Sequence, residues 1–127
     1  MIYGIGTDIV HIARIQESLN KYGDKFARRI LTTSEFKEFL NKTNQAAFLA
    51  KRFAAKEATA KAMGTGFSQG LSLQHIGVVN DNAGKPSLEL LDVAADFIKQ
   101  HNIKDSHLSL ADEKDYAVAF VTLVLKN

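Results

Sequence analysis

The sequence predicts an α+β fold in which a small, mostly antiparallel sheet packs against a long central helix and several shorter helices. The first observation is a helical period of apolar residues that dominates the chain up to Met63. The second is the change to strand-like alternation, interrupted by turn signals, after that residue. The 127 residues are 46% hydrophobic with one proline, so we expect a single domain over residues 1–127.

Composition excludes several classes of function. The chain has no cysteine, which excludes a thiol nucleophile, a disulfide framework and a cysteine-ligated metal. Any metal must therefore be bound by oxygen or imidazole ligands. No apolar run approaches the roughly 20 residues of a membrane span, and the first residues lack the basic region of a signal peptide. We expect a cytoplasmic protein that does not enter a membrane.

Charge is distributed unevenly along the chain. Up to Met63 there are 11 lysine and arginine residues against 6 acidic residues, a net charge of +5, whereas the remainder has 5 against 8, a net charge of −3. The N-terminal half should therefore prefer acidic partners. Nucleic acid, a phosphate-rich small molecule and an acidic protein surface are all compatible with this charge.

Residues 2–10 alternate as a first strand, and one of its faces carries Gly4, Gly6, Asp8 and Val10. Glycine inside a strand is tolerated where another backbone or a ligand must approach closely. A carboxylate beside such a gap makes Asp8 a candidate ligand. The alternative is that Asp8 only ends the strand or caps a helix that begins near His11.

Two basic helices are predicted next. Residues 11–22 form an amphipathic helix that ends before Gly23, and Asp24 can cap a short second helix. Basic residues recur on the exposed sides of both helices: Arg14, Lys21, Lys25, Arg28 and Arg29. They form a candidate docking patch, and a solvated face without a partner is the alternative.

Capping signals define the two helices that follow. Thr32 and Glu35 have the spacing of a capping box ahead of a third helix. Asn44 is a candidate cap for the long central helix, which should run to Met63 and stop at Gly64.

The central helix carries a carboxylate on an apolar stripe. At about 100° per residue, Leu49, Phe53 and Ala60 share a stripe with Glu57. A lone buried carboxylate is costly unless a cation pairs with it. Lys61, at i+4, can neutralise Glu57 or, with a metal present, hold a phosphate oxygen. An ordinary ion pair at the helix rim is the alternative.

A glycine loop begins directly after this helix. Gly64 and Gly66 would let backbone N–H groups approach the phosphates of a ligand. The loop follows a helix rather than a strand and lacks the Gly-Lys-Ser/Thr ending of a P-loop, which argues against a nucleoside triphosphatase.

Two hairpins with a helix between them are predicted in the C-terminal half. They cover residues 76–80, 87–90, 91–101, 108–110 and 116–125. The last strand is apolar on both faces, so it should be central in the sheet or lie at a subunit interface. His107 begins a strand and could point into a cleft. No His-x-x-x-His spacing is present, which argues against zinc, and no Gly-x-Ser-x-Gly elbow supports a serine triad.

Four motifs occur in a fixed order along the chain. They are Gly4-Ile5-Gly6-Thr7-Asp8-Ile9-Val10, then Arg52-Phe53-Ala54-Ala55-Lys56-Glu57-Ala58 with Lys61-Ala62, then Gly84-Lys85-Pro86, and then His107-Leu108-Ser109-Leu110. In these motifs, in length and in the order of elements, the chain resembles the holo-[acyl-carrier-protein] synthases. These are the small bacterial class of 4′-phosphopantetheinyl transferases.

The resemblance implies transfer of 4′-phosphopantetheine from coenzyme A to a serine of apo-acyl carrier protein, with release of adenosine 3′,5′-bisphosphate. It implies Mg²⁺ bound by Asp8 and Glu57, with coenzyme A pyrophosphate oxygens and water as the other ligands. Lys61 and Lys56 would add positive charge there. The serine proton would pass to a water on the metal or to Glu57, with Glu35 as a further candidate.

The resemblance also implies a site for coenzyme A. Its adenosine bisphosphate end would lie near Gly84-Lys85-Pro86, so that Lys85, Pro86 and His107 would contact it. Many relatives continue the last motif with Ser/Thr-His, whereas this chain has Ala111-Asp112. Contacts from those two positions are therefore left open.

Partners follow from the same resemblance. Acyl carrier proteins are acidic and would dock on the basic helical face of Arg14, Lys21, Lys25 and Arg28. Relatives assemble as homotrimers with active sites between subunits, and residues 116–125 are a candidate interface.

Two alternatives belong to other classes of function. A binding module could hold an acidic protein or nucleic acid on the basic face without chemistry. Stacking aromatics in a basic sheet and a recognition-helix signature are missing, so nucleic acid is not the expected partner. A metal-dependent phosphohydrolase would need Asp8 and Glu57 but no carrier protein.

Overall fold

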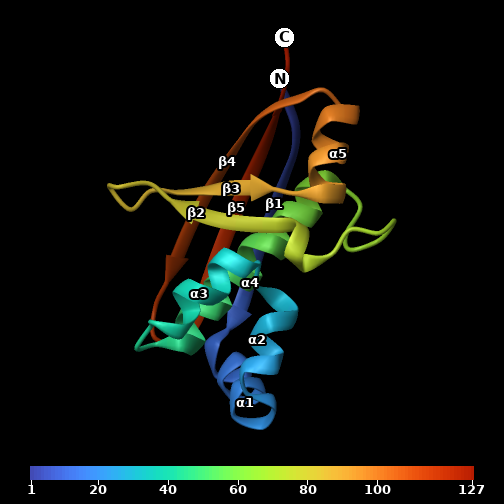
Figure 1. Ribbon diagram of the computed structural model, residues 1–127. Helices are drawn as coiled ribbons and strands as arrows, with labels where there is room; N and C mark the ends of the chain where they lie inside the picture. Colours follow the sequence, from blue (N-terminus) through green and yellow to red (C-terminus); the bar gives the residue numbers. More distant parts are fainter.

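Helix α4 (Gln45–Met63) runs through the middle of the molecule and contacts both of its sheets (Figure 1). The computed structural model describes residues 1–127. In chain order the other elements are β1 (Ile2–His11), α1 (Ile12–Tyr22), α2 (Asp24–Ile30), α3 (Thr33–Leu40), the 3₁₀ turn η1 (Leu73–His75), β2 (Ile76–Asn80), β3 (Pro86–Leu90), α5 (Asp92–Gln100), β4 (Ile103–Asp112) and β5 (Tyr116–Leu125). The predicted α+β fold class is confirmed.

The strands form two antiparallel sheets. β1, β5 and β4 pair in that spatial order, while β2 and β3 form a separate two-stranded hairpin. In Figure 1 this hairpin crosses in front of the larger sheet. β5 is the central strand, which confirms one of the two positions predicted for it. The chain ends lie together because Leu125 N donates a hydrogen bond to Met1 O at 2.8 Å (Figure 1).

One face of the larger sheet packs on α4, and the glycines of β1 permit this contact. A Cβ atom on Gly4 would overlap the Ala62 carbonyl oxygen, and one on Gly6 would overlap the Ala58 carbonyl oxygen. The prediction that a backbone approaches this bare strand face is confirmed, and the backbone is that of α4. Asp8 follows on the same strand face, so it lies against the same helix.

The two ends of α4 are the predicted ones. Asn44 Oδ1 accepts a hydrogen bond from Ala47 N at 3.1 Å, and Gly64 ends the helix with a left-handed φ of 81°. Alanines let neighbouring elements come close on nearly every side, so the helix is buried around its circumference rather than along one stripe. Neither α4 nor any other helix is long and apolar enough to cross a membrane.

The short helices begin in different ways. Thr32 and Glu35 form the predicted capping box of α3, with Glu35 N donating to Thr32 Oγ1 at 3.2 Å and Thr32 N donating to Glu35 Oε1 at 2.9 Å. The predicted cap of α2 by Asp24 is wrong, because Gly23 occupies the N-cap position. Gly23 has a φ of 65°, which turns the chain sharply after α1 at little steric cost.

The other face of the larger sheet is open and apolar. Ile5, Ile9, Val118 and Phe120 are 59%, 63%, 36% and 46% exposed. They share one face because Ile9 lies opposite Val118 and Thr7 lies opposite Phe120 across the strands. A contiguous apolar surface on a small domain marks an interaction site.

Candidate functional site

Asp8 and Glu57 meet where β1 lies against α4. Both line a pocket of about 260 Å³, together with Arg14 of α1 and Phe53 of α4. The pocket exists because the glycines of β1 bring the strand onto the helix, while the chain turns from β1 into α1 beside it. The structure therefore brings together the two predicted metal ligands, although they are far apart in the sequence.

Lys61 is paired with Asp8 rather than with Glu57. Its Nζ donates to Asp8 Oδ1 at 3.0 Å and to Thr7 O at 3.0 Å. The predicted i,i+4 pairing with Glu57 is corrected, because β1 presents a carboxylate and a carbonyl directly to the lysine. The side chain of Lys61 is 53% exposed and that of Asp8 17%, so a ligand can reach this pair.

The carboxyl of Glu57 is half-buried and lies close enough to Asp8 to be repelled by it. Burial raises the pKa of Glu57 above its ordinary value, repulsion by Asp8 raises it further, and attraction by Lys61 lowers it in part. Asp8 and Glu57 thus repel each other, although Lys61 and Arg14 lie in or beside the same pocket. A hard divalent cation, bound by oxygen ligands, would relieve that repulsion, so the donor set fits Mg²⁺.

Lys56 does not lie in this pocket. Its side chain is fully buried, and its Nζ donates to Glu35 Oε1 at 2.7 Å, to Leu73 O at 3.1 Å and to Ile76 O. All three ammonium protons are therefore used inside the protein. The prediction that Lys56 adds charge beside the metal ligands is corrected, because its position on α4 directs it to α3 and β2.

Sequence reasoning missed the charged cluster around Lys56. Arg52, one turn earlier, is 4% exposed, and its Nη2 donates to Glu38 Oε2 at 3.2 Å. Its Nε lies 3.9 Å from Glu35 Oε2 and has no hydrogen-bond partner. Burial lowers the pKa of Arg52 and of Lys56, and the nearby carboxylates offset part of that effect. Two cations at i,i+4 on a helix otherwise rich in alanine were the available signal.

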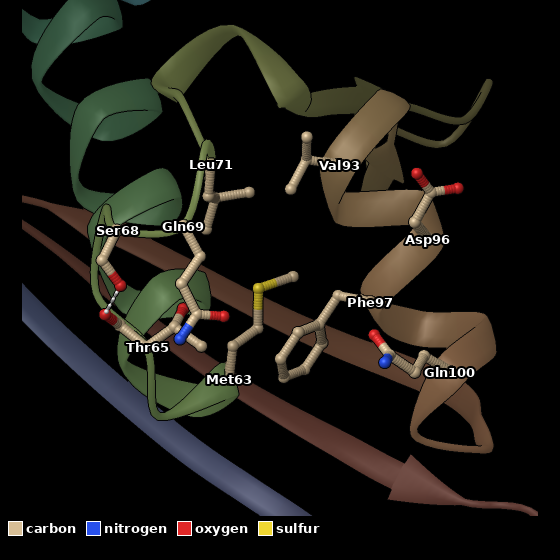
Figure 2. Close-up of a pocket in the computed structure, with 9 residues that line it drawn as sticks. All are labelled: Met63, Thr65, Ser68, Gln69, Leu71, Val93, Asp96, Phe97 and Gln100. Atoms are coloured by element: carbon tan, nitrogen blue, oxygen red, sulfur yellow. Dashed lines mark hydrogen bonds between the residues drawn. The ribbon is translucent and has the colours of Figure 1, made fainter.

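The glycine loop is used to end α4 rather than to present free amides. Gly64 N donates to Lys61 O at 3.0 Å, and Gly66 N donates to Ala60 O at 3.3 Å. The prediction that Gly64 and Gly66 offer these N–H groups to a phosphate is therefore corrected. The loop instead faces α5 across a small pocket, into which Met63 and Phe97 point (Figure 2).

The predicted coenzyme A residues of the β2–β3 turn lie in a different hollow. Gly84 and Pro86 line it with Lys51 and Arg52 of α4, whereas Lys85 is exposed and does not line it. Asp112, the position at which the fourth motif departs from many relatives, also lines this hollow and pairs with Lys51 at 3.4 Å. Within one chain, this hollow is not part of the pocket that contains Asp8 and Glu57.

His107 lies on the opposite side of the sheet from Asp8. It is exposed and pairs with Thr122, which in turn lies opposite Ile5 of β1. Asp8 pairs with the buried Ala119, so its side chain is on the face that meets α4. A single chain therefore does not bring His107 to Asp8 and Glu57.

The predicted docking residues are all exposed on α1 and α2. Arg14 is the one that also lines the Asp8 pocket, while Lys21 lies in the last turn of α1. Lys25 is free on α2, and the Arg28 guanidinium stacks over the Phe36 ring at 4.2 Å. The basic face thus begins at the rim of the pocket and extends away from it.

The fold and the paired carboxylates define a class of protein, and comparison with known families identifies it. The family model of the 4′-phosphopantetheinyl transferase superfamily matches residues 4–121. This chain belongs to that superfamily.

Within the superfamily, the chain is similar to holo-[acyl-carrier-protein] synthases. It is 54% identical to that of Nitrosococcus oceani over 124 residues, which are 98% of this chain and 80% of the relative. The crystal structure of the synthase from Neisseria meningitidis has a TM-score of 0.92 at 45% identity, covering 97% of this chain and 98% of that one. The synthase from Bacillus anthracis, solved in complex with CoA (3′,5′-ADP), has a TM-score of 0.82 at 39% identity and covers 99% of both chains.

Proposed function

We propose that this chain transfers the 4′-phosphopantetheine group of coenzyme A to a serine hydroxyl of an apo-acyl carrier protein. The observation that carries the proposal is the meeting of Asp8, Glu57 and Lys61 at one open pocket in a member of this superfamily. Coenzyme A as donor is supported by the complex of the Bacillus anthracis relative.

The reaction is a displacement at phosphorus. The serine oxygen attacks the phosphorus that bears the pantetheine arm, and the bond from this phosphorus to the bridging pyrophosphate oxygen breaks. Adenosine 3′,5′-bisphosphate leaves with that oxygen, and the serine becomes a phosphodiester. Lys61 is the available cation, since its exposed ammonium can turn from Asp8 to the phosphoryl oxygens, where charge develops.

Mg²⁺ is the metal that we assign to Asp8 and Glu57. Two carboxylates fit a cation that takes its remaining ligands from substrate phosphates and water. The chain has no group of three or more His, Cys, Asp or Glu residues that would form a closed protein cage. When bound, Mg²⁺ supplies neutralisation of charge on the pyrophosphate and on the leaving group.

The serine proton requires an acceptor in the same pocket. Glu57 is one candidate, because its carboxylate lines the pocket. Water in the pocket is the other acceptor. Glu35 is not available, since it is 3% exposed and its oxygens accept from Thr32 N, Val78 N and Lys56.

The basic face of α1 and α2 is assigned to the acidic carrier protein. Arg14 links the two functions, because it lines the catalytic pocket and stands at the start of the face. Lys21, Lys25 and Arg28 extend it along the exposed sides of the helices. Docking there would deliver the serine of the carrier protein to Asp8 and Glu57.

We propose a homotrimer, in the cytoplasm, with active sites between subunits. The open apolar face of β1 and β5 supports burial against a second copy. In a single chain, about half or more of the surface of Ile5, Ile9 and Phe120 is exposed. His107 lies on that same face. A neighbouring subunit can therefore offer His107 to a coenzyme A molecule that the chain carrying Asp8 also binds.

Intact-mass analysis of apo-acyl carrier protein tests this function. Incubation with the chain, coenzyme A and Mg²⁺ should add one phosphopantetheine mass, and the gain should be lost with chelator or with Glu57→Gln. Asp96→Asn, which removes an exposed carboxylate of α5 that lines neither the Asp8 pocket nor the basic face, is the control and should retain activity. If coenzyme A is hydrolysed and the carrier protein is not modified, the chain is a phosphohydrolase. If the carrier protein binds to the chain but is never modified, the chain is a binding module.

A further inference from the structure

Strand β2 has an edge that no other strand covers, because its sheet has only two strands. Backbone groups of residues i and i+2 point to the same edge of a strand. On this edge Ile76 O accepts a hydrogen bond from Lys56 Nζ, and Val78 N donates to Glu35 Oε2 at 2.8 Å. The two side chains are joined to each other, Nζ to Oε1, at 2.7 Å. The ion pair thus offers the open edge one donor and one acceptor, as a neighbouring strand would.

The same pair connects three segments of the chain. Lys56 comes from the middle of α4, and its remaining proton goes to Leu73 O at 3.1 Å. Glu35 comes from the start of α3, where Oε1 also accepts from Thr32 N at 2.9 Å. Lys56 is fully buried and Glu35 is 3% exposed, so water does not compete for these bonds.

The position of β2 determines the position of the turn that follows it. Asp81 Oδ1 accepts from the backbone N–H groups of Ala83 and Lys85, both at 2.9 Å, which holds the turn in one shape. Pro86 then pairs with Asn80 as the return strand begins. If β2 moved relative to α4, the whole turn would therefore move with it.

That movement would change the hollow between the turn and α4. Gly84 and Pro86 form one side of the hollow, and Arg52 forms part of the other. Arg52 lies one helical turn before Lys56, and its guanidinium faces Glu35 Oε2 at 3.9 Å. The same ion pair therefore lies beside Arg52 on one wall and holds β2, the strand that leads into the other wall.

We propose that Lys56 and Glu35 are positioning residues which take the place of a third strand at the edge of β2. They hold the β2–β3 hairpin in a fixed position against α4. This position determines the width of the hollow between Pro86 and Arg52. The inference rests on the proposed function in one respect: coenzyme A must bind with its adenosine bisphosphate end near Gly84 and Pro86, as the resemblance implies, and these residues line this hollow.

The double variant Glu35→Gln with Lys56→Met tests whether the ion pair holds the hairpin against α4. Removing both charges together leaves no unpaired buried ion, so the variant should fold. Hydrogen exchange of residues 76–80 should become at least about tenfold faster, while β1 and β5 keep their protection. Lys37→Met is the matched control, since Lys37 is an exposed lysine of α3, and it should leave exchange unchanged. Unchanged exchange at residues 76–80 in the double variant would overturn the proposal.

Kinetics and ligand binding test the consequence for the substrate. In the double variant the KM for coenzyme A and the dissociation constant of adenosine 3′,5′-bisphosphate should each rise at least about tenfold, while kcat and the KM for the carrier change less than about threefold. A fall in kcat alone, in proportion to the unfolded fraction, would reduce the pair to a stabilising role and refute positioning. If the unaltered chain transfers nothing, the proposed function fails, whereas hydrogen exchange still decides whether the pair seats the hairpin.

Discussion

Two of the lysine–carboxylate pairs formed by helix α4 have opposite surroundings. Lys56 and Glu35 approach to 2.7 Å with side chains 0% and 2% exposed. Lys61 and Asp8 approach to 3.0 Å with side chains 53% and 17% exposed. In the first pair every lysine proton is used within the protein, whereas the second pair can exchange its partner for a ligand. A buried lysine–carboxylate pair therefore stabilises the fold, whereas an exposed pair can exchange its partner for a substrate and take part in the reaction.

Breaking the buried pair should have the largest effect on stability. Lys56→Met removes the ammonium that is hydrogen-bonded to the buried Glu35 carboxylate and leaves it only the more distant Arg52, so the free energy of unfolding should fall by about 3–5 kcal/mol. Lys61→Met should change it by less than about 1 kcal/mol, because the exposed pair is screened by water. Urea unfolding followed by circular dichroism measures both. Equal losses in the two variants would contradict the distinction between the pairs.

Removing the carboxylate beside the exposed pair should affect activity instead. Glu57→Gln should lower kcat/KM for phosphopantetheine transfer by at least about 100-fold, since a proposed ligand of Mg²⁺ and acceptor of the serine proton is lost. The free energy of unfolding should stay equal or rise, because a repelled, half-buried carboxylate is neutralised. A variant that loses activity only because it unfolds would show the reverse pattern in the same circular dichroism experiment.

A smaller effect concerns the pH dependence of stability. Folding raises the pKa of Glu57 above its ordinary value of 4.5, so between these two pKa values the native state binds more protons than the unfolded state. The contribution of Glu57 to the free energy of unfolding should therefore fall as pH rises from about 4.5 and remain lower above the raised pKa. The difference between the unaltered chain and Glu57→Gln, measured by urea unfolding across this range, isolates that contribution. A difference that grows with pH in favour of the unaltered chain would contradict the assigned shift.

A third pair on α4 should have the smallest effect. Lys51 and Asp112 lie 3.4 Å apart with side chains 31% and 37% exposed. Asp112→Asn should cost less than about 1 kcal/mol of unfolding free energy, because both groups keep contact with water. Thermal or urea unfolding checks this value. A loss as large as that of Lys56→Met would show that exposure is not what separates these pairs.

The parts of the fold that were predictable are those with local causes. The capping box of Thr32 and Glu35, the Asn44 cap and the Gly64 stop each depend on residues within a few positions, so their spacing in the sequence was sufficient. Asp8 and Glu57 were also predicted to act together, through the order of motifs in the resemblance. Their approach in space depends on contacts of Gly4 and Gly6 with α4. The strand pattern predicts that some backbone or ligand lies close to these glycines, but it does not identify α4.

The sequence by itself determined the element types, the ends of the central helix and the residue types available for phosphate chemistry. Only the tertiary structure decided which environment each of two neighbouring side chains occupies. Lys56 and Glu57 are neighbours on α4, yet one is fully buried against Glu35 and the other lines an open pocket, because successive helical residues point about 100° apart toward different neighbours. His107 and Asp8 were likewise separated by the two faces of one sheet, since register decides which face a side chain takes.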